Sequence, residues 1–353
     1  MKLSTISIGL LTAALLCGNA SAAETMYGAG SQFNPLRQEG GTARAMGMGS
    51  AVVGVRQDSA SLLWNPAGLG YMSSKELGVH HNSGLGDSVQ EIAVFGTPLG
   101  EVKEPGQGGS HGGLAVSLGY VNYGSIAGAD QSGRSTGFYG SSDFSGSVGW
   151  GKQLMRDVSA GVTLKANNST IGGKGYSDFA TDLGVLWNVV PEVHLGAAYT
   201  NLALSGVSGA TTASGLRLGA GWDATKHWLL AASTELQDKA VKRLQFGTEY
   251  LLGNVEEGRN LLALRGGYQF DYPNADIGGL HGLTLGLGYA ANRSMSMDYA
   301  ILPAGDLGTS HRLSFTLKFN SPGKARTVAA APPAKAAPVA AVPAGKAKSP
   351  SSR

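Results

Sequence analysis

Apolar and polar residues alternate along most of the chain with a period of two. In the stretch 310–320, Leu313, Phe315 and Leu317 share one face of an extended chain, whereas Arg312 and Ser314 share the other. This pattern is typical of a β-strand with one apolar and one polar face. Between turn signals it predicts fourteen strands, at 75–84, 88–97, 112–122, 142–153, 158–167, 177–189, 193–203, 215–223, 227–236, 242–252, 260–270, 281–290, 295–302 and 310–320.

The composition agrees with an all-β protein. Of 353 residues, 55 are Gly, 27 are Lys or Arg and 24 are Asp or Glu, which is about twice the usual glycine and about half the usual charge. Glycine costs roughly 0.5–1 kcal/mol relative to alanine inside a helix, so a helical bundle is disfavoured. A soluble β-sandwich would alternate as well, but the number of long strands and the few charges on their apolar faces favour a transmembrane antiparallel β-barrel.

The predicted connections differ in length between the two ends of this barrel. Those at 154–157, 190–192, 224–226 and 291–294 are short, whereas those at 123–141, 168–176, 204–214 and 271–280 are longer. The exception is 98–111, a longer connection at the end with the short turns. Outer-membrane barrels have short periplasmic turns and longer outer loops. The sequence therefore predicts a bacterial outer-membrane protein whose first strand starts on the periplasmic side.

The two ends of the chain differ from its body. Residues 1–22 combine Lys2, an apolar run and Ala20-Ser21-Ala22, the signature of a signal peptide, which also contains the single cysteine, Cys17. Residues 321–353 are rich in Ala, Pro and Lys and hold no acid, which predicts a disordered periplasmic arm. We expect a hatch or plug at 23–73 and the barrel at 74–320.

Several motifs that carry chemistry in other proteins lack their context here. Ser110 lies in a Gly-Ser-His-Gly turn without the strand and helix that a nucleophile elbow needs. His80 and His81 are neighbours in a strand, so they point to opposite faces and do not share a metal. The loop with Asp271, Asn274 and Asp276 lacks the EF-hand spacing. We expect no catalytic residue, metal site, cofactor or nucleic-acid partner.

The segment before the first strand is the most distinctive part of the chain. It contains Arg44-Ala-Met-Gly-Met-Gly, then Asp58 before small residues, then Trp64-Asn65-Pro66-Ala-Gly-Leu. This segment resembles the N-terminal region of FadL-like outer-membrane proteins, above all that of their PorV/PorQ branch. Residues 307–319 of this sequence also resemble the last strand of that branch.

The resemblance implies a hatch folded inside a fourteen-stranded barrel, with Arg44, Asp58, Trp64, Asn65 and Pro66 as candidates for hatch and lumen contacts. Arg44 and Asp58 are expected to pair with luminal charges, and Asn65-Pro66 to fix a turn. The alternative is that these residues only seat the hatch. Inward glycines are expected where a side chain would collide with the plug, at 219, 221, 286 and 288.

Three functions remain open from the sequence. The first is passive movement of a hydrophobic small molecule across the outer membrane, as in FadL-type transporters, with Gly119 and Gly124 as candidates for a lateral opening. The second is a PorV-like component of a secretion or surface-assembly system, which binds a periplasmic or secreted protein through the 321–353 arm. The third is anchoring of the barrel to acidic cell-wall material by that arm. Outer-membrane lipid is an expected partner in each case.

Overall fold

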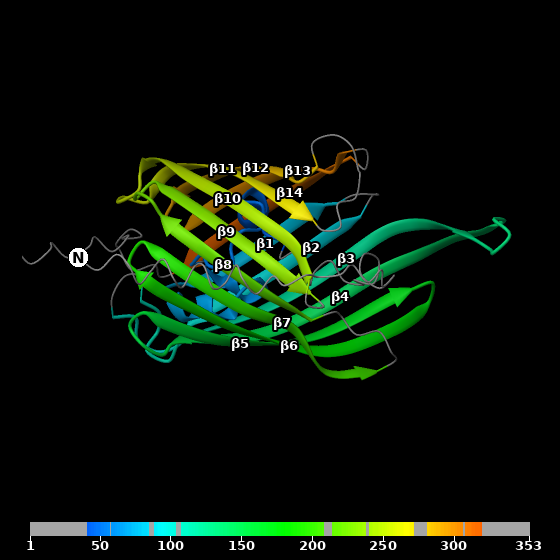
Figure 1. Ribbon diagram of the computed structural model, residues 1–353, viewed down its shortest axis with the longest axis horizontal. Coiled ribbons are helices and arrows are strands. Elements are labelled where there is room, and N and C mark those ends of the chain that lie inside the picture. The colour runs from blue at the N-terminus through cyan, green and yellow to red at the C-terminus, as the bar shows by residue number, and fades with distance from the viewer. Residues whose placement is uncertain are drawn as a thin grey trace, which may run out of the picture.

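The computed structural model describes residues 41–319, except 57, 85–87, 104–106, 208–213, 238–239, 272–280 and 306–307. This part of the chain forms a closed β-barrel with short helices inside it (Figure 1). The helices are α3 (Ala43–Gly47) and the 3-10 helices η1 (Ser59–Leu63) and η2 (Pro66–Tyr71). The strands are β1 (Lys75–Ser83), β2 (Val89–Pro98), β3 (Gly113–Ala129), β4 (Ser135–Gln153), β5 (Val158–Ile171), β6 (Lys174–Val190), β7 (Val193–Val207), β8 (Gly215–Asp223), β9 (Trp228–Gln237), β10 (Ala240–Asn254), β11 (Arg259–Asp271), β12 (Leu283–Asn292), β13 (Met295–Pro303) and β14 (Thr309–Phe319).

Every strand pairs antiparallel with its neighbours in sequence, and β14 pairs with β1 to close the barrel. At this seam Leu77 lies opposite Leu317, and Val79 lies opposite Phe315. Closure leaves no strand with an unpaired edge along the wall. The predicted all-β, fourteen-stranded antiparallel barrel is confirmed.

The two faces of the wall have opposite character. In β14, Leu313 and Phe315 point outward with 45% and 38% of their surfaces exposed, whereas Arg312 and Ser314 point inward and are buried. The exposed tryptophans lie near the short-turn ends of their strands, at 150, 187, 222 and 228. An apolar outer face with aromatic residues at its rim is the surface that a lipid bilayer covers.

The predicted long loop at 123–141 is wrong. β3 and β4 continue through this stretch as a paired ribbon and turn only at 130–134, and Figure 1 shows the ribbon extending past the rest of the barrel. The predicted loop at 168–176 likewise shrinks to a turn at 172–173. Beyond the membrane both faces of a strand contact water, so the alternation that marks the other strands disappears there.

The opposite end of the barrel matches the expected short connections. Turns at 154–157, 191–192, 224–227 and 293–294 join β4 to β5, β6 to β7, β8 to β9 and β12 to β13. We call this the short-turn end. None of the helices in the described part of the chain is long and apolar enough to span a membrane.

Candidate binding cavity in the barrel lumen

Residues 41–74, here called the luminal segment, pack inside the barrel. Met46, Met48, Leu62 and Leu69 have no exposed surface. Helix α3 contacts β11, β12, β13 and β14, whereas η2 contacts the opposite wall at β3, β4, β5 and β6. The segment therefore spans the lumen from one side of the wall to the other.

Each short helix of the luminal segment begins at a polar residue that caps it. The side chains of Thr42, Asp58 and Asn65 accept hydrogen bonds from the amides of Ala45, Ala60 and Ala67, at 3.3, 3.1 and 3.2 Å. Such caps satisfy amides that have no partner within the helix. Pro66 follows Asn65 at the first position of η2, where its fixed φ suits a helix start. The cap residues thus explain why the chain turns at these three points.

Glycines of the wall lie where the luminal segment passes closest. A Cβ at Gly219 would lie 2.7 Å from the amide nitrogen of Gly54, and one at Gly286 would lie 3.0 Å from the Cα of Gly47. At Gly219 a side chain fits only if the backbone shifts, and at Gly286 the contact is tight enough that the neighbouring backbone would have to give way slightly. At Gly288 the crowding comes instead from the side chains of Arg265 and Asp298 on the wall itself. The expected collision with the plug therefore holds at Gly219 and Gly286, and has a different origin at Gly288.

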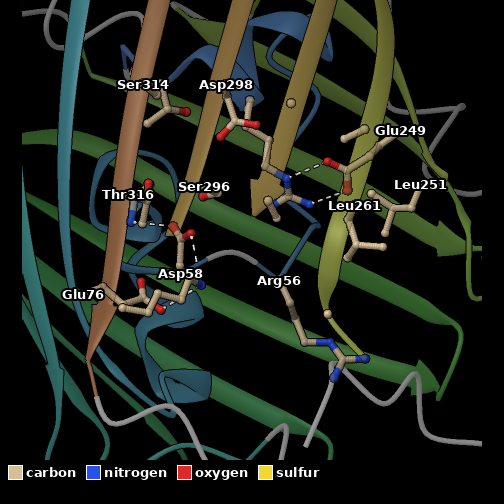
Figure 2. A pocket seen from close by; sticks show the side chains of 18 of the residues that line it. Arg56, Asp58, Glu76, Glu249, Leu251, Leu261, Ser296, Asp298, Ser314 and Thr316 are labelled. Atoms are coloured by element: carbon tan, nitrogen blue, oxygen red, sulfur yellow. Dashed lines mark hydrogen bonds and ion pairs between the residues drawn. The ribbon is translucent and has the colours of Figure 1, made fainter. Parts of the chain in front are cut away.

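An ionic cluster joins α3 to the wall, and we call it the Arg44 cluster. Arg44 donates two hydrogen bonds to the carboxylate of Glu249 on β10, both at 2.8 Å. Arg265 on β11 donates to Glu249 at 2.7 Å and to Asp298 on β13 at 2.7 Å. Two cations and two carboxylates compensate one another, which buried charges require. Figure 2 shows Glu249 and Asp298 at the inner end of the cavity.

A second cluster joins η1 to the seam of the barrel. The ammonium of Lys318 on β14 lies 3.7 Å from the carboxylate of Asp58 and 3.1 Å from that of Glu76 on β1. Glu76 also accepts a hydrogen bond of 2.8 Å from the amide of Ser59. Burial opposes ionisation of Asp58, but the charges of Lys318 and Arg44 and the amide of Ala60 outweigh it and hold the pKa of Asp58 below its ordinary value.

The middle of the luminal segment is held by Trp64 and Asn65. The amide of Asn65 donates to the carbonyls of Val53 and Val185, at 2.9 and 3.1 Å, so it links two parts of the segment and β6. The guanidinium carbon of Arg217 lies 5.6 Å from the ring centre of Trp64, within the range of a cation–π contact. These residues contact the protein rather than line the cavity described next.

The luminal segment does not fill the barrel at the short-turn end. A cavity of about 420 Å³ lies there between the segment and strands β7 to β14 and β1. Gly258 and Arg293, on turns of that end, line its mouth, and Arg44 and Glu249 line its inner part. Its volume lies within the range of small-molecule sites. Arg44 and Asp58 are the two sequence candidates that line it.

The two glycines proposed for a lateral opening occupy different settings. Gly119 keeps the regular ladder, opposite Ile92 on β2 and Ser145 on β4. Gly124 has a φ of 72° and lies at a register shift between β3 and β4, past Asn122, where the pairing with β2 ends. A positive φ is readily adopted only by glycine. The irregularity thus lies at Gly124, where the ribbon leaves the wall.

The other residues singled out from the sequence lie in separate surroundings. Oγ of Ser110 lies 3.1 Å from Nδ1 of the neighbouring His111, in an exposed turn. His80 points into the lumen and His81 outward, as their adjacent positions require. No group of His, Cys, Asp and Glu in the described residues is arranged to hold a metal ion. Asn274, Asp276, residues 1–40 and the 321–353 arm lie outside the described residues.

Sequence reasoning missed most of the charged wall residues in the two clusters that hold the luminal segment. Glu249, Arg265, Asp298 and Lys318 come from four strands, and only the folded barrel brings them together. The sequence feature that could have identified them is a charged residue on the face of a strand that otherwise carries small or polar residues. Sequence reasoning also missed His194. Its Nε2 lies 3.0 Å from Nη2 of Arg56 on the luminal segment and 3.1 Å from Oδ2 of Asp223.

Searches of protein-family models and of curated proteins find no match to this sequence. The fold does match solved structures. The Pseudomonas putida toluene transporter TodX aligns with a TM-score of 0.55 and 13% identity, covering 78% of this chain and 96% of its own. The Ralstonia pickettii toluene transporter TbuX aligns at 0.54 and 14%, covering 79% and 98%. A Pseudomonas aeruginosa FadL homologue aligns at 0.50 and 11%, covering 79% and 98%. The chain therefore has a FadL-like fold.

Proposed function

We propose that this protein is an outer-membrane channel for passive movement of small hydrophobic molecules, in which the luminal segment acts as a hatch. The observation that carries the proposal is the cavity at the short-turn end, which is bounded at its inner end by α3 and the Arg44 cluster. A molecule that reaches this cavity from the outer side has to pass the luminal segment. Movement of that segment would open the path.

Two further observations support transport. The barrel has the fold of two toluene transporters, and one wall of the cavity is apolar, with Leu229, Leu251, Leu261 and Ala263. Under this proposal the domain limits are those expected from the sequence: a signal peptide at 1–22, a hatch at 23–73, the barrel at 74–320 and a periplasmic arm at 321–353. Of the two candidates for a lateral exit, Gly119 lies within the regularly paired wall, and Gly124 lies at the irregular pairing where the ribbon leaves the wall.

Uptake by whole cells tests the proposal, since a plain phospholipid bilayer does not retain hydrocarbons but an outer leaflet of lipopolysaccharide slows them. We expect cells with the protein to take up radiolabelled p-xylene faster than cells without it. Ala263→Trp should block the cavity and remove the increase, because Ala263 points inward and is 5% exposed. Leu264→Trp, on the outer face of the same strand, is the matched control. Equal uptake with and without the protein would refute transport.

The ribbon formed by residues 123–140 favours a second candidate function, partner binding in secretion or surface assembly as in the PorV/PorQ branch. Its pairing with β2 ends at Asn122 and its pairing with β5 ends at Ser141, and Phe138 is 77% exposed. A photo-crosslinker at Phe138 should yield one discrete protein adduct in cells. The same crosslinker at Leu118, on the outer face of the wall, is the control; identical patterns at both positions would exclude this function.

A further inference from the structure

The cavity has two chemically different walls. Leu229, Leu251, Leu261 and Ala263 form an apolar wall from β9, β10 and β11. Across from it, β13, β14 and β1 contribute neutral hydrogen-bonding groups: Ser296, Ser314, Thr316 and His80. Figure 2 shows Leu251 and Leu261 on one side and Ser314 and Thr316 on the other. A ligand that contacts both walls has a hydrocarbon part and a polar part.

The carboxylates that line the cavity all have cationic or histidine partners. Glu249 and Asp298 pair with arginines in the Arg44 cluster, Asp58 and Glu76 pair with Lys318, and Asp223 contacts His194. In the inner part of the cavity an ionic ligand would have to break one of these pairs and leave a buried charge without its partner, which is costly. Arg56 and Arg293 also line the cavity, and they bond to the carbonyls of Pro191 and Glu256 at the short-turn end. The inner part of the cavity therefore favours a ligand without net charge.

One neutral donor at the polar wall has an unused hydrogen-bonding position. The amide of Ala43 donates to Oγ of Ser314 at 2.8 Å, and this Oγ lies 2.8 Å from Nδ1 of His80. Ser314 Oγ can also donate its own proton to Nδ1, whereas a proton on Nδ1 would leave the hydroxyl without an acceptor among the described contacts. Donation to Nδ1 uses both groups and places the imidazole proton on Nε2. His80 is 3% exposed, and its Nε2 has no hydrogen-bond partner among the described residues.

We propose that the cavity binds an uncharged molecule with a hydrocarbon body and one oxygen acceptor, such as an alcohol or a ketone, and that the oxygen accepts a hydrogen bond from Nε2 of His80. A buried donor without a partner is unfavourable. Nε2 is buried although His80 lines the cavity, so the imidazole has to shift toward the cavity to meet a ligand oxygen, which then supplies the missing acceptor. The hydrocarbon body then contacts the leucines of the opposite wall. This inference rests on the transport function proposed above, because it names the substrate class of the same cavity.

Three ligands with one carbon skeleton test the inference: p-xylene, 4-methylbenzyl alcohol and 4-methylbenzoate. Their binding to the purified full chain in lipid nanodiscs is measured by calorimetry at pH 7, with empty nanodiscs as the reference for partitioning into lipid. We expect the alcohol to bind about threefold to tenfold more tightly than p-xylene, the gain from one hydrogen bond, and the benzoate to bind most weakly. Equal binding of the alcohol and p-xylene, or tightest binding of the benzoate, would overturn the inference.

Variants of two adjacent histidines assign the preference to one side chain. His80→Phe should reduce binding of the alcohol to that of p-xylene, and His80→Gln, which keeps an N–H donor, should retain part of the preference. His81→Phe is the matched control, because His81 points outward and contacts Glu91 at 2.6 Å. A preference that survives His80→Phe overturns the role of His80, and a His80→Phe protein that does not fold leaves the His80→Gln comparison to decide.

The cellular uptake assay separates this inference from the proposed function. Faster uptake of p-xylene together with equal binding of the three ligands would retain the channel and reject the substrate class. Preferential binding of the alcohol without faster uptake of p-xylene or of the alcohol would retain the binding site and reject transport.

Discussion

Arg44 and Asp58 fix the luminal segment to two different parts of the wall, and their environments differ. Arg44 shares the carboxylate of Glu249 with Arg265, so two cations depend on that single carboxylate. Asp58 shares the ammonium of Lys318 with Glu76. Loss of Glu249 should therefore have larger consequences than loss of one of the cations that it binds.

We expect Glu249→Gln to lower the free energy of unfolding by about 3–5 kcal/mol, the usual cost of removing one member of a buried ion pair. Arg44→Met should cost less, because Glu249 keeps its bond to Arg265. Urea unfolding in lipid vesicles, followed by circular dichroism, measures both. Glu256→Gln, in an exposed pair with Lys226, is the control and should change little. Equal effects of all three substitutions would contradict the assigned cluster.

The ionised form of Asp58 should stabilise the protein in a pH-dependent way. Its pKa is lowered in the folded state, so this stabilisation is complete above the ordinary value of 3.8 and is lost as pH falls through the lowered folded value. The difference in free energy of unfolding between wild type and Asp58→Asn should thus be constant from pH 8 to pH 5 and shrink below pH 4. Urea titrations over this range measure it, and a difference that grows below pH 4 would contradict the pairing.

The luminal segment and the wall fit together as elements because the wall carries glycines along the path of the segment. These contacts come from backbone meeting backbone, as at Gly54 and Gly219, so they depend on the absence of a Cβ rather than on any side chain. Such a fit leaves little room for movement while the segment is seated. It also explains why the glycine content is high in a protein without flexible glycine-rich repeats.

Gly219→Ala should lower the free energy of unfolding by about 1–3 kcal/mol, since the added methyl group would lie 2.7 Å from the amide nitrogen of Gly54. Gly266→Ala is the matched control, because Gly266 faces outward and the nearest atom to its Cβ, Cγ2 of Thr248, lies 3.9 Å away. Urea unfolding in lipid vesicles compares the two. A control that is destabilised as much as Gly219→Ala would show that the cost is not due to the luminal segment.

Strands could be predicted from the sequence wherever one face meets lipid and the other meets the lumen. Alternation located β8 at its observed bounds, Gly215–Asp223. It failed beyond Asn122, where Gly124, Gly128 and Gly137 replace the apolar positions of the ribbon. For the site, the N-terminal motif identified Arg44 and Asp58, but Glu249 and Lys318 lie about two hundred residues or more away, and no local pattern marks them as partners. His80 was considered only as a metal ligand.

At the scale of the whole molecule, the barrel encloses the luminal segment, which contacts opposite sides of the wall and leaves a cavity on one side of it. The channel proposal therefore requires the segment to leave its seat during transport. The mature chain contains no cysteine if residues 1–22 are removed, so a disulfide can be introduced to hold the segment in place.

The variant Gly47→Cys/Ala300→Cys tests this requirement, since a Cβ at Gly47 would lie 3.6 Å from that of Ala300, within the range of disulfides. A Cβ at Gly47 would also lie 2.9 Å from the Cα of Gly286, so the single variant Gly47→Cys measures what the added side chain does to uptake without the disulfide. Initial uptake of radiolabelled p-xylene is measured in cells with the pair oxidised and again after reduction, with each single cysteine variant as a control. We predict that oxidation lowers uptake to that of cells without the protein and that reduction restores it. Equal uptake in the oxidised and reduced states would show that the luminal segment does not act as a hatch.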